Sequence, residues 1–388
     1  MGFHVAPDDH IKQGKVTDVY FERVAQTLES RGINPRVVME VRAATLPRGW
    51  PWAVFAGLEE VMELVQGLPV TMQSLDEGTL FRAGEPVLSL RGDYLDFGLY
   101  ETAILGFLCQ ASGIATSAAR CKAAAGERAV ISFGARRMHP AIAPMIERNA
   151  FIGGCDGVAV VESAELIGEE PSGTMSHSLI LCAQDERAAF EAFDEAMPPE
   201  VQRVALVDTF QDEKFGALYA AEVLGDSLYA VRLDTPGSRR GDFLKIMKEV
   251  RWELDLRGFE HVKIFISGNI DEEQILKYNL VADAYGVGTH ISNSPVVNFS
   301  MDIVELDGRP LAKRGKESGV KQLWVCAGCD ERRTEPHGKG SRPCLECGGA
   351  MEALLKERYA EGVALKENPA PRQIRSYVLE QLSSVDIF

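Results

Sequence analysis

Four cysteines near the C-terminus have the spacing of a metal site. Cys326 and Cys329 form one Cys-x-x-Cys pair, and after fourteen residues Cys344 and Cys347 form a second. Two-residue spacing lets both thiolates of a pair reach one ion, and two pairs complete a tetrahedral set of sulfur ligands. The spacing predicts a structural Zn²⁺; a four-thiolate iron centre and reduced cysteines without metal are the alternatives. Because protein fills all four positions, this metal would leave no coordination position open for catalysis.

A second group of residues with binding chemistry follows short apolar runs in the middle of the chain. In order, the segments are Phe133-Gly-Ala-Arg136-Arg137, Gly173-Thr174-Met-Ser-His177, Asp208-Thr, Arg232-Leu-Asp234-Thr235, Ser267-Gly268-Asn269 and Gly286-Val-Gly288-Thr289. The two glycine-containing segments at the end of this series offer backbone N–H groups that an anion can approach closely. Of these two, Ser267-Gly268-Asn269 also precedes the N-terminus of a predicted helix, and a helix N-terminus favours anions. Acidic residues 271–273 already occupy that helix end.

Several of these side chains suit phosphate or carboxylate recognition. Arg136, Arg137 and Arg232 offer forked donors, although a single arginine is as readily a surface ion pair. Asp208 ends an apolar run, where a buried carboxylate could orient a histidine such as His177. Phe133 taken alone is more typical of a core residue than of a surface on which a ligand stacks. The residues by themselves indicate an enzyme that acts on a phosphorylated small molecule.

The elements that must position these residues alternate between strand and helix. Strands are predicted at 129–133, 157–161, 179–182, 204–208, 229–233, 262–267 and 281–287, with helices at 186–197, 213–224 and 242–256. Such alternation predicts parallel strands joined by right-handed crossovers. About seven strands suit a closed or nearly closed α/β barrel, whose chemistry lies where strands end; a doubly wound open sheet is the alternative.

The chain divides into three predicted parts. Residues 1–110, with a helix over 18–30 and strands at 37–41 and 86–90, form an α+β N-terminal domain completed by strands within 295–320. Residues 111–294 form the α/β barrel domain, which begins within an Ala-rich helix ending near residue 125. Residues 320–388 form a zinc-knuckle domain with a terminal helix over 371–384.

Composition narrows the class of protein. The formal charge of −16 disfavours nucleic acid and anionic membranes as partners, although basic residues beside the cysteines leave a zinc-ribbon binding module as an alternative. No signal peptide is predicted, and the apolar run 103–119 is interrupted by polar residues and glycines, as in a buried helix. Eight cysteines without a secretory signal indicate a reducing compartment, so a cytoplasmic location is expected.

Taken in order, these segments resemble the nicotinate phosphoribosyltransferase family in its short form with a cysteine knuckle. The resemblance covers about residues 14 to 320 and adds Thr17-Asp18-x-Tyr20 to the segments above. It implies a type II phosphoribosyltransferase-like fold, an irregular α/β barrel, that forms nicotinate mononucleotide and pyrophosphate from nicotinate and phosphoribosyl pyrophosphate. It also implies coupled ATP hydrolysis, Mg²⁺ carried with the substrate, and a homo-oligomer with shared active sites.

The resemblance implies a role for each site residue. Catalysis is expected of His177, which would be phosphorylated from ATP, and of Asp208, which would fix its tautomer. The substrate-binding residues are expected to be Asp18, Tyr20 (from a neighbouring subunit), Phe133, Arg136, Arg137, Thr174, Arg232, Asp234, Ser267, Gly268, Asn269, Gly286, Gly288 and Thr289. The sequence departs from the family pattern after Thr235, where Arg239 and Arg240 could add phosphate contacts or be solvated.

Three other functions are alternatives to nicotinate phosphoribosyl transfer. A quinolinate enzyme is expected to be shorter, without the cysteine knuckle, and to need more basic residues for a second carboxylate. A nicotinamide enzyme is expected to need an additional acidic residue for the amide. A catalytically idle zinc-ribbon scaffold is expected to have lost the phosphate loops, which are intact here.

Overall fold

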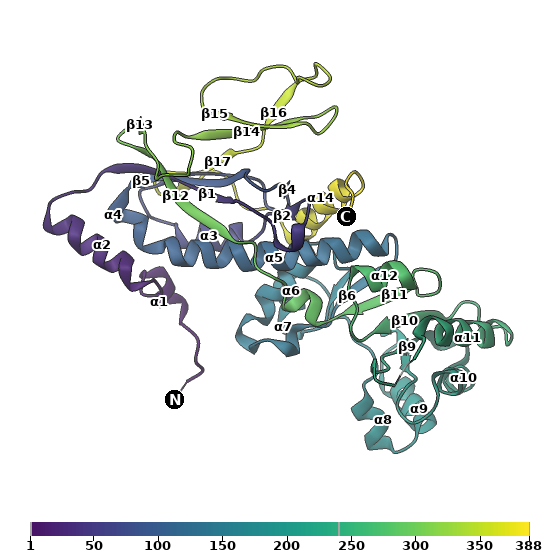
Figure 1. The fold of residues 1–388 in the computed structure, drawn as a ribbon. Helices are drawn as coiled ribbons and strands as arrows, with labels where there is room; N and C mark the ends of the chain where they lie inside the picture. Colours follow the sequence, from purple (N-terminus) through teal and green to yellow (C-terminus); the bar gives the residue numbers. More distant parts are fainter. Residues whose placement is uncertain (1, 240, 388) are drawn as a thin grey trace. The chain divides into compact units, whose positions relative to one another are not determined.

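A computed structural model describes residues 2–239 and 241–387 (Figure 1). The described residues form two compact units, one within 2–116 and 295–387 and the other within 117–239 and 241–294. Residues 320–387 group with the N-terminal residues in the first unit. The helix α5 (Glu101–Ala125) carries the chain from the first unit into the second.

The first unit is built on a seven-stranded antiparallel sheet. Its strand order is β13-β12-β1-β5-β3-β17-β18. The strands are Arg309–Pro310, Phe299–Leu306, Arg36–Ala43, Pro86–Asp93, Thr71–Ser74, Lys356–Ala360 and Val363–Ala364. Helices α3 (Leu58–Leu64) and α5 contribute Leu58, Val61, Ile104 and Leu108 to one buried cluster with Val41, Leu88 and Leu90 of the sheet. A hairpin at Asp307-Gly308 pairs β13 with β12, and β12 pairs with β1, so strands within 295–320 complete this sheet.

Smaller elements complete the first unit. Helices α1 (Asp8–Lys12), α2 (Val19–Ser30) and α14 (Pro371–Leu382) come from the two ends of the chain, and α4 (Tyr94–Phe97) precedes α5. A two-stranded ladder joins β2 (Ala53–Val54) to β4 (Leu80–Phe81). Residues 94–125 are long and apolar enough to cross a membrane, but two thirds of their most apolar stretch (67%) is buried inside the structure. Burial in the protein core accounts for that composition.

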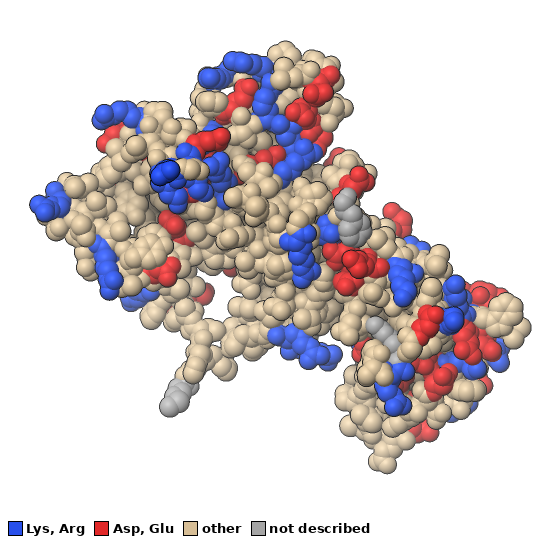
Figure 2. Space-filling view, in the orientation of Figure 1, with Lys and Arg blue, Asp and Glu red and all other residues tan. Residues whose placement is uncertain are grey.

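The cysteine knuckle is a three-stranded antiparallel sheet of β14 (Lys321–Cys326), β15 (Arg332–Pro336) and β16 (Met351–Ala353). Both arginines of β15 have acidic partners: Arg332 Nη1 lies 3.0 Å from Glu85 Oε2, and Arg333 Nε lies 3.6 Å from Glu335 Oε1. Figure 2 shows acidic and basic side chains interspersed over this part of the surface. A neutralised surface of this kind gives little attraction for a polyanion.

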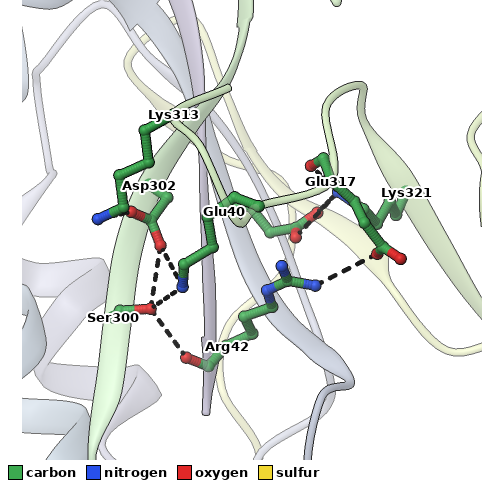
Figure 3. Close-up of polar contacts among 8 residues, drawn as sticks. Glu40, Arg42, Ser300, Asp302, Lys313, Glu317 and Lys321 are labelled. Carbon is green, nitrogen blue, oxygen red and sulfur yellow. Dashed lines mark hydrogen bonds and ion pairs between the residues drawn. The ribbon is translucent and has the colours of Figure 1, made fainter. Parts of the chain in front are cut away.

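The register of the large sheet places two carboxylates opposite each other, on Glu40 of β1 and Asp302 of β12. Like charges in such pairs are destabilising, and here lysines of the following segment neutralise them (Figure 3). Lys321 Nζ lies 3.2 Å from Glu40, and Lys313 and Lys316 lie 2.6 and 2.7 Å from Asp302. These ion pairs tie residues 313–321 to the sheet.

Glu101, the first residue of α5, gives the first unit a pH-dependent stability. Burial, with smaller contributions from Asp302 and Asp18 and against the opposing effect of Lys313, raises its pKa to about 7. Below pH 4.5, which is the pKa of this carboxyl in the unfolded chain, the carboxyl is protonated in both the folded and the unfolded chain. Between pH 4.5 and 7 the unfolded chain loses that proton while the folded chain keeps it, so the free energy of unfolding falls.

We expect Glu101→Gln to remove this decline, because an amide does not titrate. Urea unfolding at pH 5 and pH 8 measures the difference for the wild type and the variant, with the exposed Glu29→Gln as matched control. An equal pH dependence of wild type and Glu101→Gln would contradict the prediction.

The second unit contains a six-stranded parallel sheet of order β7-β6-β11-β10-β9-β8. In that order the strands are Gly157–Val158, Ala129–Ser132, Ala284–Val287, Lys263–Ser267, Leu228–Leu233 and Arg203–Leu206. The helices are α6 (Ala143–Ile152), α7 (Val161–Ile167), α8 (His177–Ala183), α9 (Glu186–Ala196), α10 (Glu213–Leu224), α11 (Phe243–Asp255), α12 (Glu272–Tyr278) and α13 (Thr289–Ser292). In the described residues β7 and β8 pair with no further strand, so the sheet is an open half-barrel.

One predicted strand is wrong. The apolar run Leu179–Cys182 lies inside α8, where Ser176 Oγ accepts a hydrogen bond from Leu179 N at 3.3 Å and caps the helix. A run of four apolar residues does not distinguish a strand from a buried turn of helix, and only Ile180 of this run is fully buried. The sheet therefore has six strands and not seven.

Candidate active site

The loops after the parallel strands lie at one edge of the half-barrel, because the carboxyl ends of parallel strands share an edge. Arg232, near the end of β9, joins three of these loops. Its Nε donates to Ser267 Oγ at 3.0 Å, its Nη1 to Thr174 Oγ1 at 2.7 Å, and its Nη2 to Asp234 Oδ2 at 3.1 Å. The side chain is 13% exposed. Two of its five N–H groups remain for a ligand.

A chain of polar contacts continues from Asp234 to His177. Ser267 Oγ donates to Asp234 Oδ1 at 2.7 Å, and the Asp234 N–H donates to Asp208 Oδ2 at 3.1 Å. The other carboxylate oxygen of Asp208 lies 3.3 Å from His177 Nε2. The Asp208 side chain is 2% exposed and that of His177 is 42% exposed. A buried carboxylate thus faces one imidazole nitrogen while the ring keeps access to solvent.

Burial raises the pKa of Asp208, and the neighbouring Asp234 adds to that shift. His177, the Asp234 N–H and the Thr235 hydroxyl oppose it. Thr235 also donates a short hydrogen bond to the buried Glu213 at the start of α10. Sequence reasoning missed Glu213, because its only local signal is its place in the first turn of a helix.

Phe133 lies directly after β6 and against the glycine loop that follows β11. Its N–H donates to Val287 O at 2.9 Å, and the Arg232 guanidinium carbon lies 5.1 Å from the centre of its ring. A Cβ atom added to Gly286 would lie 2.4 Å from Phe133 Cδ2. Only glycine therefore lets the phenyl ring occupy this position.

The other loop residues lie at the same edge with free surface. Gly268 and Asn269 have φ angles of 83° and 54°, which turn the backbone sharply between β10 and α12. Arg136, Arg137, Asn269 and Thr289 are exposed, and Gly288 is partly exposed. Arg239 is also exposed, and Arg240 lies outside the described residues. The edge thus has exposed donors around the buried residues Arg232 and Asp208.

Two of the predicted binding residues, Asp18 and Tyr20, lie in the first unit. Each contacts other residues of that unit. Asp18 Oδ2 accepts a hydrogen bond from Thr102 Oγ1 at 3.1 Å. Tyr20 is 53% exposed on α2, with its ring centre 4.1 Å from that of Phe21. Neither unit by itself brings these two residues together with the strand-end group.

The four cysteines of the knuckle converge as their spacing predicts. Cys326 Sγ lies 3.4 Å from Cys347 Sγ, and Cys329 Sγ lies 3.6 Å from Cys344 Sγ. All four sulfurs lie within 4.8 Å of one another, and none is in a disulfide. Ligands about 2.3 Å from a central ion at tetrahedral angles have separations close to these. The cluster can therefore hold a metal ion.

Comparison with known proteins gives consistent matches over most of the chain. Family models described as the N-terminal and C-terminal domains of quinolinate phosphoribosyl transferase match residues 18–112 and 114–302. A nicotinate phosphoribosyltransferase of Mycobacterium tuberculosis is 33% identical, with 86% of this chain and 83% of that protein covered. The nicotinate phosphoribosyltransferase of Bacillus subtilis is 30% identical, with 76% of this chain and 67% of that protein covered.

Solved structures show the same fold. The structure of nicotinate-nucleotide pyrophosphorylase from Pyrococcus furiosus is 52% identical, has a TM-score of 0.97, and covers 99% of this chain and 98% of that chain. Human nicotinic acid phosphoribosyltransferase has a TM-score of 0.74 at 20% identity, over 95% of this chain and 94% of that chain, and this match shows the fold alone.

Proposed function

The chain belongs to the nicotinate phosphoribosyltransferase family, and from this premise we propose that it forms nicotinate mononucleotide and pyrophosphate from nicotinate and phosphoribosyl pyrophosphate. The observation that carries the proposal is the continuous set of contacts from Thr174 and Ser267 through Arg232 and Asp234 to Asp208 and His177. It supplies a cation, hydroxyl-binding carboxylates and a nucleophile at one edge of one sheet.

The reaction makes modest demands on proton transfer. Pyrophosphate leaves C1 of the ribose with the bonding electron pair, and the pyridine nitrogen of nicotinate forms the new bond to the resulting oxocarbenium-like carbon. Positioning and charge stabilisation therefore dominate the catalysis. We assign the base to Phe133 and to the two free N–H groups of Arg232. We assign the ribose hydroxyls to Asp234 and the phosphates to Arg136, Arg137, Gly268, Asn269, Gly286, Gly288 and Thr289.

ATP coupling is assigned to His177. Because Nε2 faces Asp208 at 3.3 Å, Nδ1 is the nitrogen left to attack the γ-phosphorus of ATP. The P–O bond to ADP breaks as the P–N bond forms, and water later releases phosphate from the imidazole. Asp208 holds the tautomer and stabilises the imidazolium charge. Mg²⁺, when bound, neutralises the polyphosphate charge.

Mg²⁺ is expected to be held mainly by substrate oxygens and water. In the described part of the chain, groups of three or more ligating side chains close enough for one ion occur only at the four cysteines and at Cys121, Glu272 and His290. Zn²⁺ is the proposed ion of the four-cysteine site, since a tetrahedral all-thiolate set suits it. Metal analysis of the purified protein tests this, with one zinc per chain expected.

A homo-oligomer with shared sites is supported by the exposed apolar face of α2. Val19, Tyr20 and Val24 of α2 are exposed, as is Val16 shortly before the helix. We propose that a neighbouring subunit covers this face and receives Tyr20 at its base-binding site. The partners are then small molecules and copies of this chain, in the cytoplasm.

The deciding experiment follows nicotinate mononucleotide formed from nicotinate, phosphoribosyl pyrophosphate and Mg²⁺, with and without ATP. We expect ATP to increase product in the wild type and to have no effect in His177→Ala, whereas His261→Ala, an exposed histidine just before β10, keeps the stimulation.

A parallel assay contains quinolinate in place of nicotinate, because the matching family models are described as domains of quinolinate phosphoribosyl transferase. We expect no turnover, since the guanidinium of Arg232 is already paired with Asp234, and Arg136 and Arg137 of the loop after β6 are exposed. Turnover of quinolinate but not nicotinate would overturn the assignment of the base while keeping the phosphate loops.

A further inference from the structure

A buried charged cluster that the proposed chemistry does not use lies beside the phosphate loops. Arg120 of α5 places Nε 2.9 Å from Glu272 Oε1, and His290 places Nε2 2.6 Å from Glu272 Oε2. The three side chains are 5%, 8% and 15% exposed, respectively. We refer to Arg120, Glu272 and His290 as the ion triad. A carboxylate with both oxygens contacted by cationic or N–H groups is a costly arrangement to bury unless the contacts are kept.

Two residues of the ion triad lie at the starts of helices that follow neighbouring strands of the parallel sheet. Glu272 is the first residue of α12 and directly follows the loop 267–271, in which Gly268 and Asn269 have positive φ angles. His290 is the second residue of α13, two residues after Gly288, which alone connects β11 to this helix. One carboxylate therefore contacts side chains at the ends of two strand-end connections. In the first of these, the non-glycine residue Asn269 has a positive φ angle, which persists only where the surroundings hold it.

The charges within the triad support a fixed carboxylate. Burial alone would raise the pKa of Glu272, but contacts with His290, its own backbone N–H and Arg120 lower it to about 2. Cys121 Sγ lies within 4.8 Å of the Glu272 and His290 ligand atoms, so a metal site is the competing interpretation. The Arg120 guanidinium on the same carboxylate opposes a bound cation, and both carboxylate oxygens already have partners.

We propose that the ion triad positions the two phosphate-binding loops relative to each other, so that affinity for phosphoribosyl pyrophosphate depends on three residues outside the reacting groups. This inference rests on the proposed assignment of phosphate to these loops. Arg120, Glu272 and His290 are positioning residues: they fix backbone N–H groups of the loops, and the substrate contacts are made by the loops.

The test uses the whole chain and measures binding of phosphoribosyl pyrophosphate in the absence of nicotinate. Isothermal titration with phosphoribosyl pyrophosphate and Mg²⁺ compares wild type, Glu272→Gln and the matched control Glu273→Gln, an exposed residue next in the same helix. We expect the Kd to rise at least about tenfold in Glu272→Gln and to stay within about twofold in Glu273→Gln. Steady-state kinetics should show the KM for phosphoribosyl pyrophosphate rising in parallel, with little change in the KM for nicotinate.

Each other outcome has a defined meaning. Unchanged binding in Glu272→Gln, or a selective rise in the KM for nicotinate, would overturn the inference. If Glu272→Gln does not fold, His290→Gln carries the same test, because it leaves Arg120 paired with the carboxylate. Two metal ions per chain in the wild type, falling to one in Cys121→Ser, would identify a metal site in place of the triad. Wild-type binding of phosphoribosyl pyrophosphate without turnover of nicotinate would refute the proposed function alone.

Discussion

Replacing Arg232 with methionine is expected to lower kcat/KM about 10²- to 10³-fold, the range for loss of one preorganised charged donor in a closed site. Methionine keeps much of the apolar volume of arginine but cannot donate to Thr174, Ser267 or Asp234. Asp234 would also lose its ion-pair partner and Asp208 a nearby positive charge, which favours their neutral forms. Steady-state kinetics with both substrates varied measures the effect.

Lysine at the same position separates charge from geometry. An ammonium restores the positive charge but not the planar fork that reaches three loops, so we expect Arg232→Lys to recover only part of the activity. Arg257→Met is the matched control, because Arg257 is exposed at the end of α11 and pairs only with Glu253 among the described residues. Values of kcat/KM for Arg232→Met within about threefold of wild type would show that Arg232 is not central to the site.

Gly286→Ala is expected to raise the KM for nicotinate at least about tenfold by displacing the Phe133 ring. The added Cβ would lie 2.4 and 2.5 Å from Phe133 Cδ2 and Cε2, closer than real side-chain contacts allow. The centre of the Phe133 ring also lies 5.7 Å from the centre of the Phe265 ring. The Phe133 ring therefore cannot move without disturbing its packing against Phe265. Overpacking of this kind costs about 1–3 kcal/mol of stability, which a shift in Tm reports.

Two further variants identify the cause. Gly237→Ala adds the same methyl group where nothing lies within 4 Å, so kinetics and Tm should match the wild type. In the Gly286→Ala background, Phe133→Leu removes the ring atoms that clash, and we expect it to restore Tm without restoring affinity for nicotinate. Recovery of both, or a normal KM in Gly286→Ala, would refute the assignment of Phe133 to the base.

Local spacing determined much of what the sequence revealed. The four cysteines have a signature of two short pairs, and the alternation of apolar runs with helical segments indicates parallel strands whose ends share an edge. These patterns depend on contacts between residues close in the chain or on the periodicity of a single element. For that reason the cysteine cluster and the α/β fold are predictable from the sequence, whereas the family is indicated by the resemblance of the ordered segments taken together.

Only the tertiary structure decided which side chains meet. Arg232 bonds Thr174 and Ser267 across 58 and 35 residues, and Arg120 meets Glu272 across 152 residues. The pairing of Glu40 with Asp302 depends on strand register, and the run 179–182 becomes helix through a cap and one buried face. Such contacts have no local signature, because they arise from crossovers, register and burial that the whole chain sets together.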